Sequence, residues 1–188
     1  MKKILIVLGA TGGHIFPGLA IAKNFKKMDE EIVVSFVNTK NIKIGFLKIE
    51  PSQELFEINS LGFKGKPFLL KIKSLLVLVI SIFQSNKIIN NFKPDAIIGT
   101  GSFVALPVSL CGFLKGSKIF TIEGNSVPGL SNRLIGRFCK NIFINFDESK
   151  KYFPEKKCLT SGYPVREFLI EKIDNQKKDL LILGGSQG

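Results

Sequence analysis

The sequence contains little cysteine and few acidic residues. Its three cysteines, Cys111, Cys139 and Cys158, are widely separated, odd in number and form no CxxC pair. This pattern argues against a disulfide framework and a cysteine metal site, and it indicates free thiols in a reducing compartment. The 15 acidic residues are outnumbered by 27 Lys and Arg, which gives a net charge of +12. Such a surplus favours an anionic partner, whether nucleic acid, phospholipid headgroups or a diphosphate, and charge alone does not choose among them.

The two long stretches without charged residues, residues 4–22 and 96–114, are both interrupted by glycine and proline. Residues 4–22 carry no charged side chain, but Pro17 and the preceding Thr11–His14 would break an apolar helix in its middle, which argues against a signal peptide. Residues 96–114 are long enough to span a bilayer. They contain three glycines and a proline, so a strand, a turn and a buried helix fit this segment better.

Short apolar runs alternate with helical patterns along the chain, which is typical of a parallel sheet covered on both faces by helices. Hydrophobic residues make up 45% of the 188 residues, enough for one α/β domain with a sizeable core. We therefore predict a Rossmann-like α/β fold. The predicted strands are 3–8, 32–37, 54–58, 95–99, 118–123, 141–145, 158–161 and 180–183, and the predicted helices are 17–27, 69–91, 103–114, 129–139 and 147–153.

The carboxyl-terminal part of the sequence changes character. A charged segment, residues 167–178, follows Gly162 and is the one plausible linker. Beyond it an apolar run, residues 179–183, leads into the glycine-rich residues 184–188, as a new strand leads into a turn. A domain that begins with one strand cannot bury both faces of that strand. We therefore expect a first domain over residues 1–162, and a linker, first strand and glycine-rich loop of a truncated second domain over residues 163–188.

The loop after the first predicted strand, residues 9–17, combines glycines with the only histidine of the chain. Glycine permits close approach of a ligand, and Pro17 near the first helical turn would leave helix amides free to face an anion such as a diphosphate. The loop matches neither the G-x-G-x-x-G nor the P-loop pattern, so tight-turn geometry is the alternative. His14 is either bonded to backbone at a helix start or a base or donor at a sugar or phosphate.

Two further loops follow predicted strands. Residues 99–103, Gly-Thr-Gly-Ser-Phe, either supply a second anion cradle or close a turn. Glu123, Asn125 and Arg133 place a carboxylate, an amide and a cation after the next strand, which indicates polar recognition; the alternative is that Asn125 or Ser131 caps the following helix. Ligands of open α/β sheets bind at the carboxyl ends of the strands. We therefore expect the three loops to form one site.

Lysines surround an apolar segment between residues 64 and 93. Its uncharged run, residues 74–86, is shorter than the roughly 20 residues that a bilayer span requires. One interpretation is a helix on the membrane surface, with leucines at the acyl boundary and lysines at anionic headgroups. The other is a core helix with solvated ends.

The sequence resembles the MurG-type transferases over its whole length. Four spaced motifs in the right order carry the resemblance: residues 12–17 (GGHIFP), 125–133, 164–166 (PVR) and 184–188 (GGSQG). Members of this family are bacterial enzymes that add N-acetylglucosamine from its UDP donor to undecaprenyl-diphosphate-muramoyl-pentapeptide in peptidoglycan synthesis. The resemblance implies a two-domain GT-B glycosyltransferase with inversion at the anomeric carbon, of which this chain is mainly the amino-terminal, acceptor-binding half.

The resemblance also implies roles for individual residues. His14 and Asn125 would be catalytic residues at the reacting sugar. The acceptor diphosphate is expected on Thr11, Gly12, Gly13, Gly99, Gly101 and Ser102. The UDP-N-acetylglucosamine is expected on Thr11, Gly12, Gly13, Asn125, Arg166 and Ser186. No metal and no cofactor are implied.

The chain departs from the family pattern in three places. The family usually has G-x-G-G-Y, and this chain has Ser102 and Phe103 at the last two of these positions. The family usually has H-E-Q-N, and this chain has Ile122-Glu123-Gly124-Asn125. In the usual G-N-P-V-R, Tyr163 replaces the asparagine.

The expected partners are UDP-N-acetylglucosamine, the undecaprenyl-linked acceptor and an anionic membrane surface, which implies a peripheral protein at the cytoplasmic face of the bacterial inner membrane. No nucleic acid is expected, because the sequence contains no recognisable nucleic-acid module and its lysines are spread out. The chain is expected to be inactive without the donor half. The alternative is a non-catalytic, membrane-binding acceptor module that recruits a separate donor-binding subunit.

Overall fold

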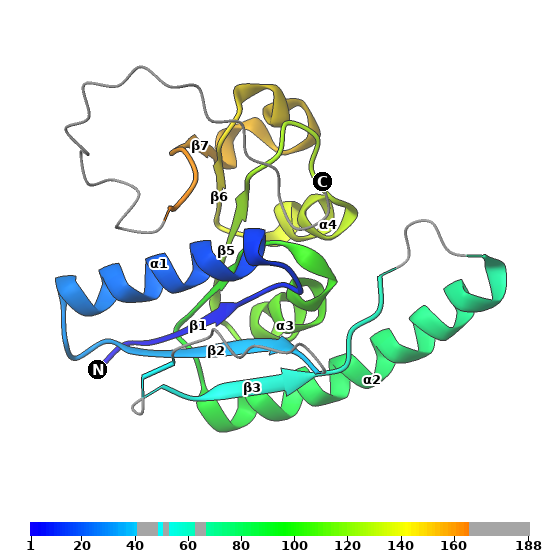
Figure 1. Cartoon of the computed structure of the whole chain (residues 1–188), viewed down its shortest axis with the longest axis horizontal. Coiled ribbons are helices and arrows are strands. Elements are labelled where there is room, and N and C mark those ends of the chain that lie inside the picture. The colour runs from blue at the N-terminus through cyan, green and yellow to red at the C-terminus, as the bar shows by residue number, and fades with distance from the viewer. Residues whose placement is uncertain (41–48, 51–52, 63–66, 166–188) are drawn as a thin grey trace, which may run out of the picture.

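Seven parallel strands form one sheet in the order β3-β2-β1-β4-β5-β6-β7 (Figure 1). The computed structural model describes residues 1–40, 49–50, 53–62 and 67–165. The strands are β1 (Lys3–Val7), β2 (Val33–Thr39), β3 (Leu55–Ile58), β4 (Ala96–Gly99), β5 (Lys118–Glu123), β6 (Asn141–Ile144) and β7 (Cys158–Thr160). They confirm the predicted α/β fold and match seven predicted strands within two residues at each end. The predicted strand 180–183 lies outside the described residues.

Helices cover the two faces of the sheet unequally. The helix α1 (Gly12–Met28) lies on one face, and α2 (Phe68–Phe92), α3 (Ser102–Leu114) and α4 (Leu130–Phe138) lie on the other (Figure 1). The predicted helix over 147–153 is a 3₁₀ helix, η1 (Asp147–Tyr152), and a second one, η2 (Glu155–Lys157), follows it. Both lead into the edge strand β7.

Two apolar clusters, one on each side of the sheet, explain the uninterrupted apolar runs. In β1, Leu5 and Val7 belong to a cluster with side chains of α2, α3 and α4. Ile4 and Ile6 belong to the other cluster, together with Ile15 of α1. Successive residues of a strand face opposite sides, so a strand buried on both sides must be apolar at every position.

The start of α1 differs from the prediction. The helix begins at Gly12, five residues before the predicted start, and Pro17 lies inside it. Proline has no N–H, so the carbonyl of Gly13 lacks its usual helical donor. The hydroxyl of Tyr163 donates a hydrogen bond to that oxygen at 2.7 Å. Pro17 therefore leaves a carbonyl without its donor, and a side chain 150 residues away in the sequence satisfies it. Pro17 lies beyond the first turn, so it is not the cause of the free helix amides that the sequence analysis expected.

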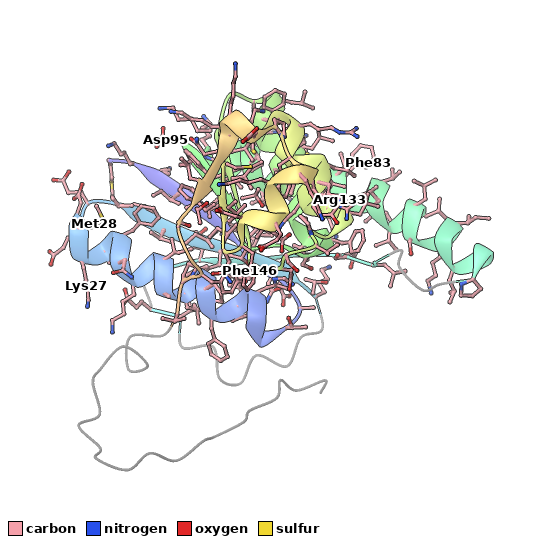
Figure 2. The ribbon with its side chains drawn as sticks, turned by 90° about the horizontal axis from the view of Figure 1, so that it is seen from above. Lys27, Met28, Phe83, Asp95, Arg133 and Phe146 are labelled. Carbon is pink, nitrogen blue, oxygen red and sulfur yellow. The ribbon has the colours of Figure 1, made fainter. Side chains whose placement is uncertain are left out.

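Residues 96–114 and the helix α2, two apolar stretches that are long enough to span a bilayer, have different surroundings. Residues 96–114 form β4, a turn and the largely buried helix α3, as predicted. In α2, Ile72–Phe92 is long and apolar enough to cross a membrane by length and composition. One side of α2 is buried in the domain, and the amino-terminal half of the helix projects beyond the sheet (Figures 1 and 2). The other side exposes large apolar residues: Leu70, Ile72, Leu75, Leu76, Val79, Ile80 and Phe83.

The cysteines are free thiols, as predicted. Burial raises the pKa of Cys139 to about 11 and also raises the pKa of Cys111. Both thiols therefore stay protonated near neutral pH, where only a thiolate is a good nucleophile or metal ligand. Among the described residues, no group of His, Cys, Asp and Glu side chains is placed to hold a metal ion.

Candidate functional site

The three loops meet at the carboxyl ends of β1, β4 and β5, as the sequence analysis expected. They enclose a cavity of about 610 Å³. The strand β1 lies between β2 and β4, so the chain reverses its direction of progress across the sheet at this point. Such a switch point is where open α/β sheets bind ligands. The cavity is lined by Ala10, Thr11, His14, Thr100, Gly101, Ser102, Phe103, Glu123, Gly124, Asn125, Gly129, Leu130, Ser131 and Asn132.

Three helices begin at this cavity. Their N-cap residues, Thr11 for α1, Gly101 for α3 and Gly129 for α4, all line it. Within the described part of the chain, none of these helices has a side-chain cap or an acidic residue in its first turn. The first amides of a helix lack intrahelical partners and carry a partial positive charge. Three such ends around one cavity are an arrangement of backbone amides that favours an anion.

Side-chain cations contribute little to this cavity. Its described lining contains neither Lys nor Arg. Arg133, which the sequence analysis grouped with Glu123 and Asn125, is a residue of α4 (Figure 2) and is not among the residues that line the cavity. Its guanidinium carbon is 4.2 Å from the ring centroid of Tyr152, and its Nε donates to the carbonyl of Pro128 at 3.1 Å. The expectation of a cation in this cluster is therefore wrong, because an aromatic ring and a carbonyl hold the side chain outside.

His14 is held by the second loop. Its Nδ1 lies 2.8 Å from the carbonyl oxygen of Thr100, and the Thr100 hydroxyl donates to the carbonyl of His14 at 2.7 Å. A carbonyl can only accept, so Nδ1 carries the proton and, in the neutral ring, Nε2 keeps a lone pair. The two interpretations of His14 are therefore compatible: it is bonded to backbone, and its other nitrogen can accept a proton.

Glycines make room for the imidazole. A methyl group at Gly101 would lie 2.7 Å from Cε1 and 2.9 Å from Nδ1 of His14. A methyl group at Gly9 would lie 2.6 Å from the Cβ of His14. Gly101 has a φ of +107°, and Ser102 also has a positive φ of 73°, which is costly for a residue other than glycine. The loop backbone therefore adopts strained angles at the place where it encloses the histidine.

A buried hydrogen-bond network fixes the third loop. Glu123, which is 3% exposed, accepts at Oε1 from the backbone N–H and the Nδ2 of Asn125, each at 2.9 Å. Its Oε2 accepts from Nδ2 of Asn132 at 3.0 Å, and Asn132 Oδ1 accepts from the hydroxyl of Thr121 at 2.9 Å. A buried carboxylate requires such donors. Glu123 therefore holds Asn125 in place.

The sequence-predicted site residues are largely brought together. Thr11, His14, Gly101, Ser102 and Asn125 line the cavity. Gly12 and Gly13 are the first residues of α1, and Gly99 ends β4 directly before the second loop. Arg166 and Ser186 lie outside the described residues. The alternative that Asn125 or Ser131 caps α4 is wrong, because the N-cap is Gly129 and makes no side-chain capping bond.

Sequence reasoning missed the roles of three residues. Thr100 bonds His14, Asn132 bonds Glu123, and Tyr163 bonds the first turn of α1. Thr100 directly follows β4, which is a signal that could have identified it, whereas Asn132 lies in α4 and only its burial beside Glu123 shows its role. Nothing near Tyr163 in the sequence indicates its contact, because 150 residues separate it from Gly13.

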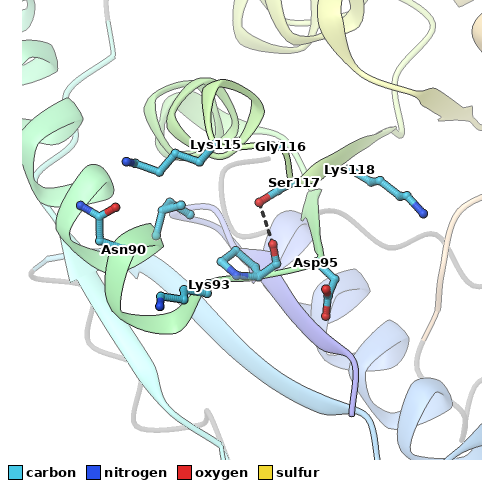
Figure 3. Close-up of a pocket in the computed structure, with 9 residues that line it drawn as sticks. Asn90, Lys93, Asp95, Lys115, Gly116, Ser117 and Lys118 are labelled. Carbon is cyan, nitrogen blue, oxygen red and sulfur yellow. Dashed lines mark hydrogen bonds between the residues drawn. The ribbon is translucent and has the colours of Figure 1, made fainter.

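A second pocket, at the amino ends of β4 and β5, is more basic (Figure 3). It measures about 450 Å³ and is lined by Lys93, Lys115 and Lys118 among others. Figure 3 shows the side chain of Lys118 pointing away from Lys93 and Lys115. The lysines therefore do not converge on one point.

Comparison with known proteins agrees with this geometry. The family model "Glycosyltransferase family 28 N-terminal domain" matches residues 4–144. A protein of Syntrophus aciditrophicus named UDP-N-acetylglucosamine--N-acetylmuramyl-(pentapeptide) pyrophosphoryl-undecaprenol N-acetylglucosamine transferase is 40% identical over 99% of this chain and 53% of its own length. A protein of the same name from Thermodesulfovibrio yellowstonii is 36% identical over 99% of this chain and 54% of its own length. The chain spans about half the length of these curated relatives.

Solved structures show the same fold. MurG of Acinetobacter baumannii superposes with a TM-score of 0.73 at 24% identity, over 89% of this chain and 47% of that protein. A UDP-GlcNAc 2-epimerase of Methanocaldococcus jannaschii, in complex with UDP-GlcNAc and UDP, superposes with a TM-score of 0.66 at 15% identity, over 86% of this chain and 47% of that protein. The fold is that of one half of a two-domain GT-B protein. Together with the family model over residues 4–144, this shows that the chain belongs to glycosyltransferase family 28 and carries its N-terminal domain.

Proposed function

We propose that this chain is the acceptor-binding half of an inverting glycosyltransferase of peptidoglycan synthesis. The enzyme would transfer N-acetylglucosamine from UDP-N-acetylglucosamine to undecaprenyl-diphosphate-muramoyl-pentapeptide. The observation that carries the proposal is the cavity at which three uncapped helices begin around the single histidine. The names of relatives at 36–40% identity support the substrates.

The acceptor diphosphate would bind at the amino ends of α1 and α3. Thr11, Gly12 and Gly13 of the first loop, and Gly101 and Ser102 of the second, would supply backbone amides and two hydroxyls, with Gly99 ending the strand just before them. Backbone amides fixed by a helix neutralise an anion without ordering flexible lysine side chains.

His14 and Asn125 would act at the reacting sugar. Nε2 of His14 would accept the proton of the attacking acceptor hydroxyl while the hydroxyl oxygen bonds to the anomeric carbon of the donor. The bond between that carbon and the donor phosphate oxygen breaks, UDP leaves with the bonding electrons, and the configuration inverts. Thr100 holds the imidazole and Glu123 holds Asn125, so neither group needs to be ordered when the substrate arrives.

The donor would bind mainly outside the described residues. Arg166 and Ser186 would contact the UDP-N-acetylglucosamine, with Thr11, Gly12, Gly13 and Asn125 at its sugar and phosphate. Residues 163–188 would then be the linker, first strand and glycine-rich loop of the donor-binding domain.

The exposed apolar side of α2 would dock the protein on the membrane. Leu75, Leu76 and Phe83 are 56%, 61% and 72% exposed, and Lys73 and Lys87 are exposed on the same helix. Apolar side chains at the acyl boundary with lysines at anionic headgroups are typical of a peripheral protein. The enzyme would then lie at the cytoplasmic face of the bacterial inner membrane, where its lipid acceptor would be held.

A sedimentation experiment tests the membrane surface. We expect vesicles containing anionic lipid to retain the chain, and Leu76→Asp with Phe83→Asp to abolish the retention. Met28→Asp is the matched control, since Met28 is 80% exposed at the end of α1, away from α2. Retention by duplex DNA at the same ionic strength, without retention by vesicles, would contradict the proposal.

A transfer assay tests the proposed reaction. Labelled UDP-N-acetylglucosamine and the lipid acceptor are mixed with the 188-residue chain alone and with the chain supplied with a donor-binding half. We expect product only in the second mixture. Turnover by the chain alone would contradict the proposal that acceptor and donor bind to different halves of the enzyme. If both substrates bind but neither mixture gives product, the proposed reaction is contradicted.

A further inference from the structure

Tyr163 is the described residue that connects the end of the domain to the candidate site. It follows β7 and Gly162, and its partly buried ring packs against the apolar cluster beneath α1. Its hydroxyl donates to the carbonyl of Gly13 at 2.7 Å. Pro17 cannot supply the helical N–H for that carbonyl, so the phenol is the donor that keeps the first turn of α1 satisfied.

The ring of Tyr163 also contacts the third loop. A methyl group built at Gly124 would lie 2.7 Å from Cε2 and 2.9 Å from Cζ of the ring. The ring therefore occupies the space that a side chain at position 124 would need. Gly124 lies between Glu123 and Asn125, the pair joined by two hydrogen bonds. Burial, with a smaller contribution from the carboxylate of Glu123, raises the pKa of Tyr163 to about 12. The hydroxyl is protonated at physiological pH even without this shift, so it is a donor there.

We propose that Tyr163 is a positioning residue that locks the first and third loops of the site in register, its hydroxyl holding Gly13 and its ring holding Gly124. One side chain thereby fixes the amino end of α1 relative to Asn125. The proposal rests on the proposed function only for the ligand, which is the diphosphate group. The contacts themselves are independent of it.

The test uses the 188-residue chain, NMR and inorganic pyrophosphate as the probe. Tyr163→Phe removes the hydroxyl and keeps the ring. We expect it to move the carbonyl ¹³C resonance of Gly13, to weaken pyrophosphate binding by about 3- to 10-fold, the size of one hydrogen bond, and to lower the melting temperature by a few degrees, because the same bond stabilises the first turn of α1. Tyr152→Phe is the matched control, because Tyr152 contacts Arg133 and lies outside the cavity lining. It should change neither the Gly13 resonance nor the pyrophosphate affinity.

A second variant tests the contact of the ring. Gly124→Ala should displace the ring and weaken pyrophosphate binding at least as much as Tyr163→Phe does. In a Tyr163→Ala background, where the ring is missing, Gly124→Ala should have no further effect on the affinity. Independent, multiplying effects of the two substitutions would overturn the proposal.

The outcomes separate this inference from the proposed function. An unmoved Gly13 resonance in Tyr163→Phe, or a moved resonance with pyrophosphate affinity unchanged within twofold, overturns the positioning role. If the wild-type chain binds no pyrophosphate, the diphosphate site fails. The carbonyl resonance of Gly13 then still decides whether Tyr163 makes its contact, because it is measured without any ligand. A shift of that resonance in Tyr163→Phe but not in Tyr152→Phe supports the contact, and an unmoved resonance overturns it.

Discussion

The amino ends and the carboxyl ends of the parallel strands, here called the amino edge and the carboxyl edge, differ in the positive groups that they offer to an anion. At the amino edge, Lys93, Lys115 and Lys118 line a pocket from which their side chains diverge (Figure 3). At the carboxyl edge, the described lining contains no Lys or Arg, and three helices begin there instead. A net charge of +12 therefore says little about where an anion binds. Backbone amides held by a helix can face an anion without ordering a side chain, whereas exposed lysines must be ordered to do so.

The largest expected effect concerns the single histidine of the carboxyl edge. His14→Gln keeps a polar side chain but removes the proton acceptor, so the rate of transfer should fall by about 10²- to 10⁴-fold, the range for general-base catalysis. The assay is product formation with the donor half supplied. Binding of both substrates should persist, and a loss below tenfold would contradict the assignment of His14 as the base.

A pair of glycine variants compares the two edges directly. Gly101→Ala introduces a side chain at a φ of +107° and against His14, and it should lower the free energy of unfolding by about 2–4 kcal/mol. Gly116→Ala is the matched control at the amino edge, because Gly116 has a φ of +87° and nothing within 4 Å of an added methyl. It should cost only the backbone strain, about 1–2 kcal/mol. Denaturant unfolding measures both, and equal losses would contradict the contact with His14.

The buried network predicts a smaller effect. Glu123→Gln replaces one acceptor oxygen by an amide nitrogen, which leaves a donor facing a donor of Asn125 or Asn132. An unsatisfied buried group of this kind costs about 1–3 kcal/mol. Thermal unfolding and a His14 NMR spectrum would show lower stability with the imidazole unchanged. Unchanged stability would mean that the network does not hold the third loop.

High pH should weaken the contact of Tyr163 at the carboxyl edge. Its pKa in the folded protein, about 12, exceeds the value of 10.0 for a free phenol. The folded state therefore binds more protons between these values, and its stability falls as the pH rises from about 10 to 12. Unfolding measured across this range should show a steeper loss in the wild type than in Tyr163→Phe. Parallel pH profiles would contradict the raised pKa.

The smallest effect is expected at the amino edge. Replacing Lys93, Lys115 and Lys118 together by glutamine should change the free energy of unfolding by less than about 0.5 kcal/mol per site and leave pyrophosphate binding intact, because exposed substitutions of this kind are near neutral. Titration calorimetry checks the binding. A tenfold loss of affinity in this variant would move the anion site to the opposite edge.

The sequence was most informative where local pattern decides the structure. Uninterrupted apolar runs followed by glycine-rich loops predicted seven described strands and the edge at which His14, Gly101 and Asn125 meet. What it could not predict depends on contacts between distant segments. The hydroxyl of Tyr163 bonds the carbonyl of Gly13 that Pro17 leaves without its helical donor, although 150 residues separate Tyr163 from Gly13.

Two departures from the family pattern show the same limit. Gly124 and Tyr163 look like unrelated substitutions in the sequence. In the structure the ring of Tyr163 fills the space beside Gly124, so the two positions form one contact. Arg133 is a similar case, since only the position of Tyr152 shows that its guanidinium lies outside the cavity.

The most direct test of the central claim is an NMR titration of the 188-residue chain with inorganic pyrophosphate, in which the amide resonances report which edge binds. We expect saturable shifts of the amides at the amino ends of α1, α3 and α4: Gly12, Gly13, Ser102, Phe103, Leu130 and Ser131. Shifts confined to Lys93, Lys115 and Gly116 at the amino edge, or no saturable shift at the three helix starts, would contradict that claim.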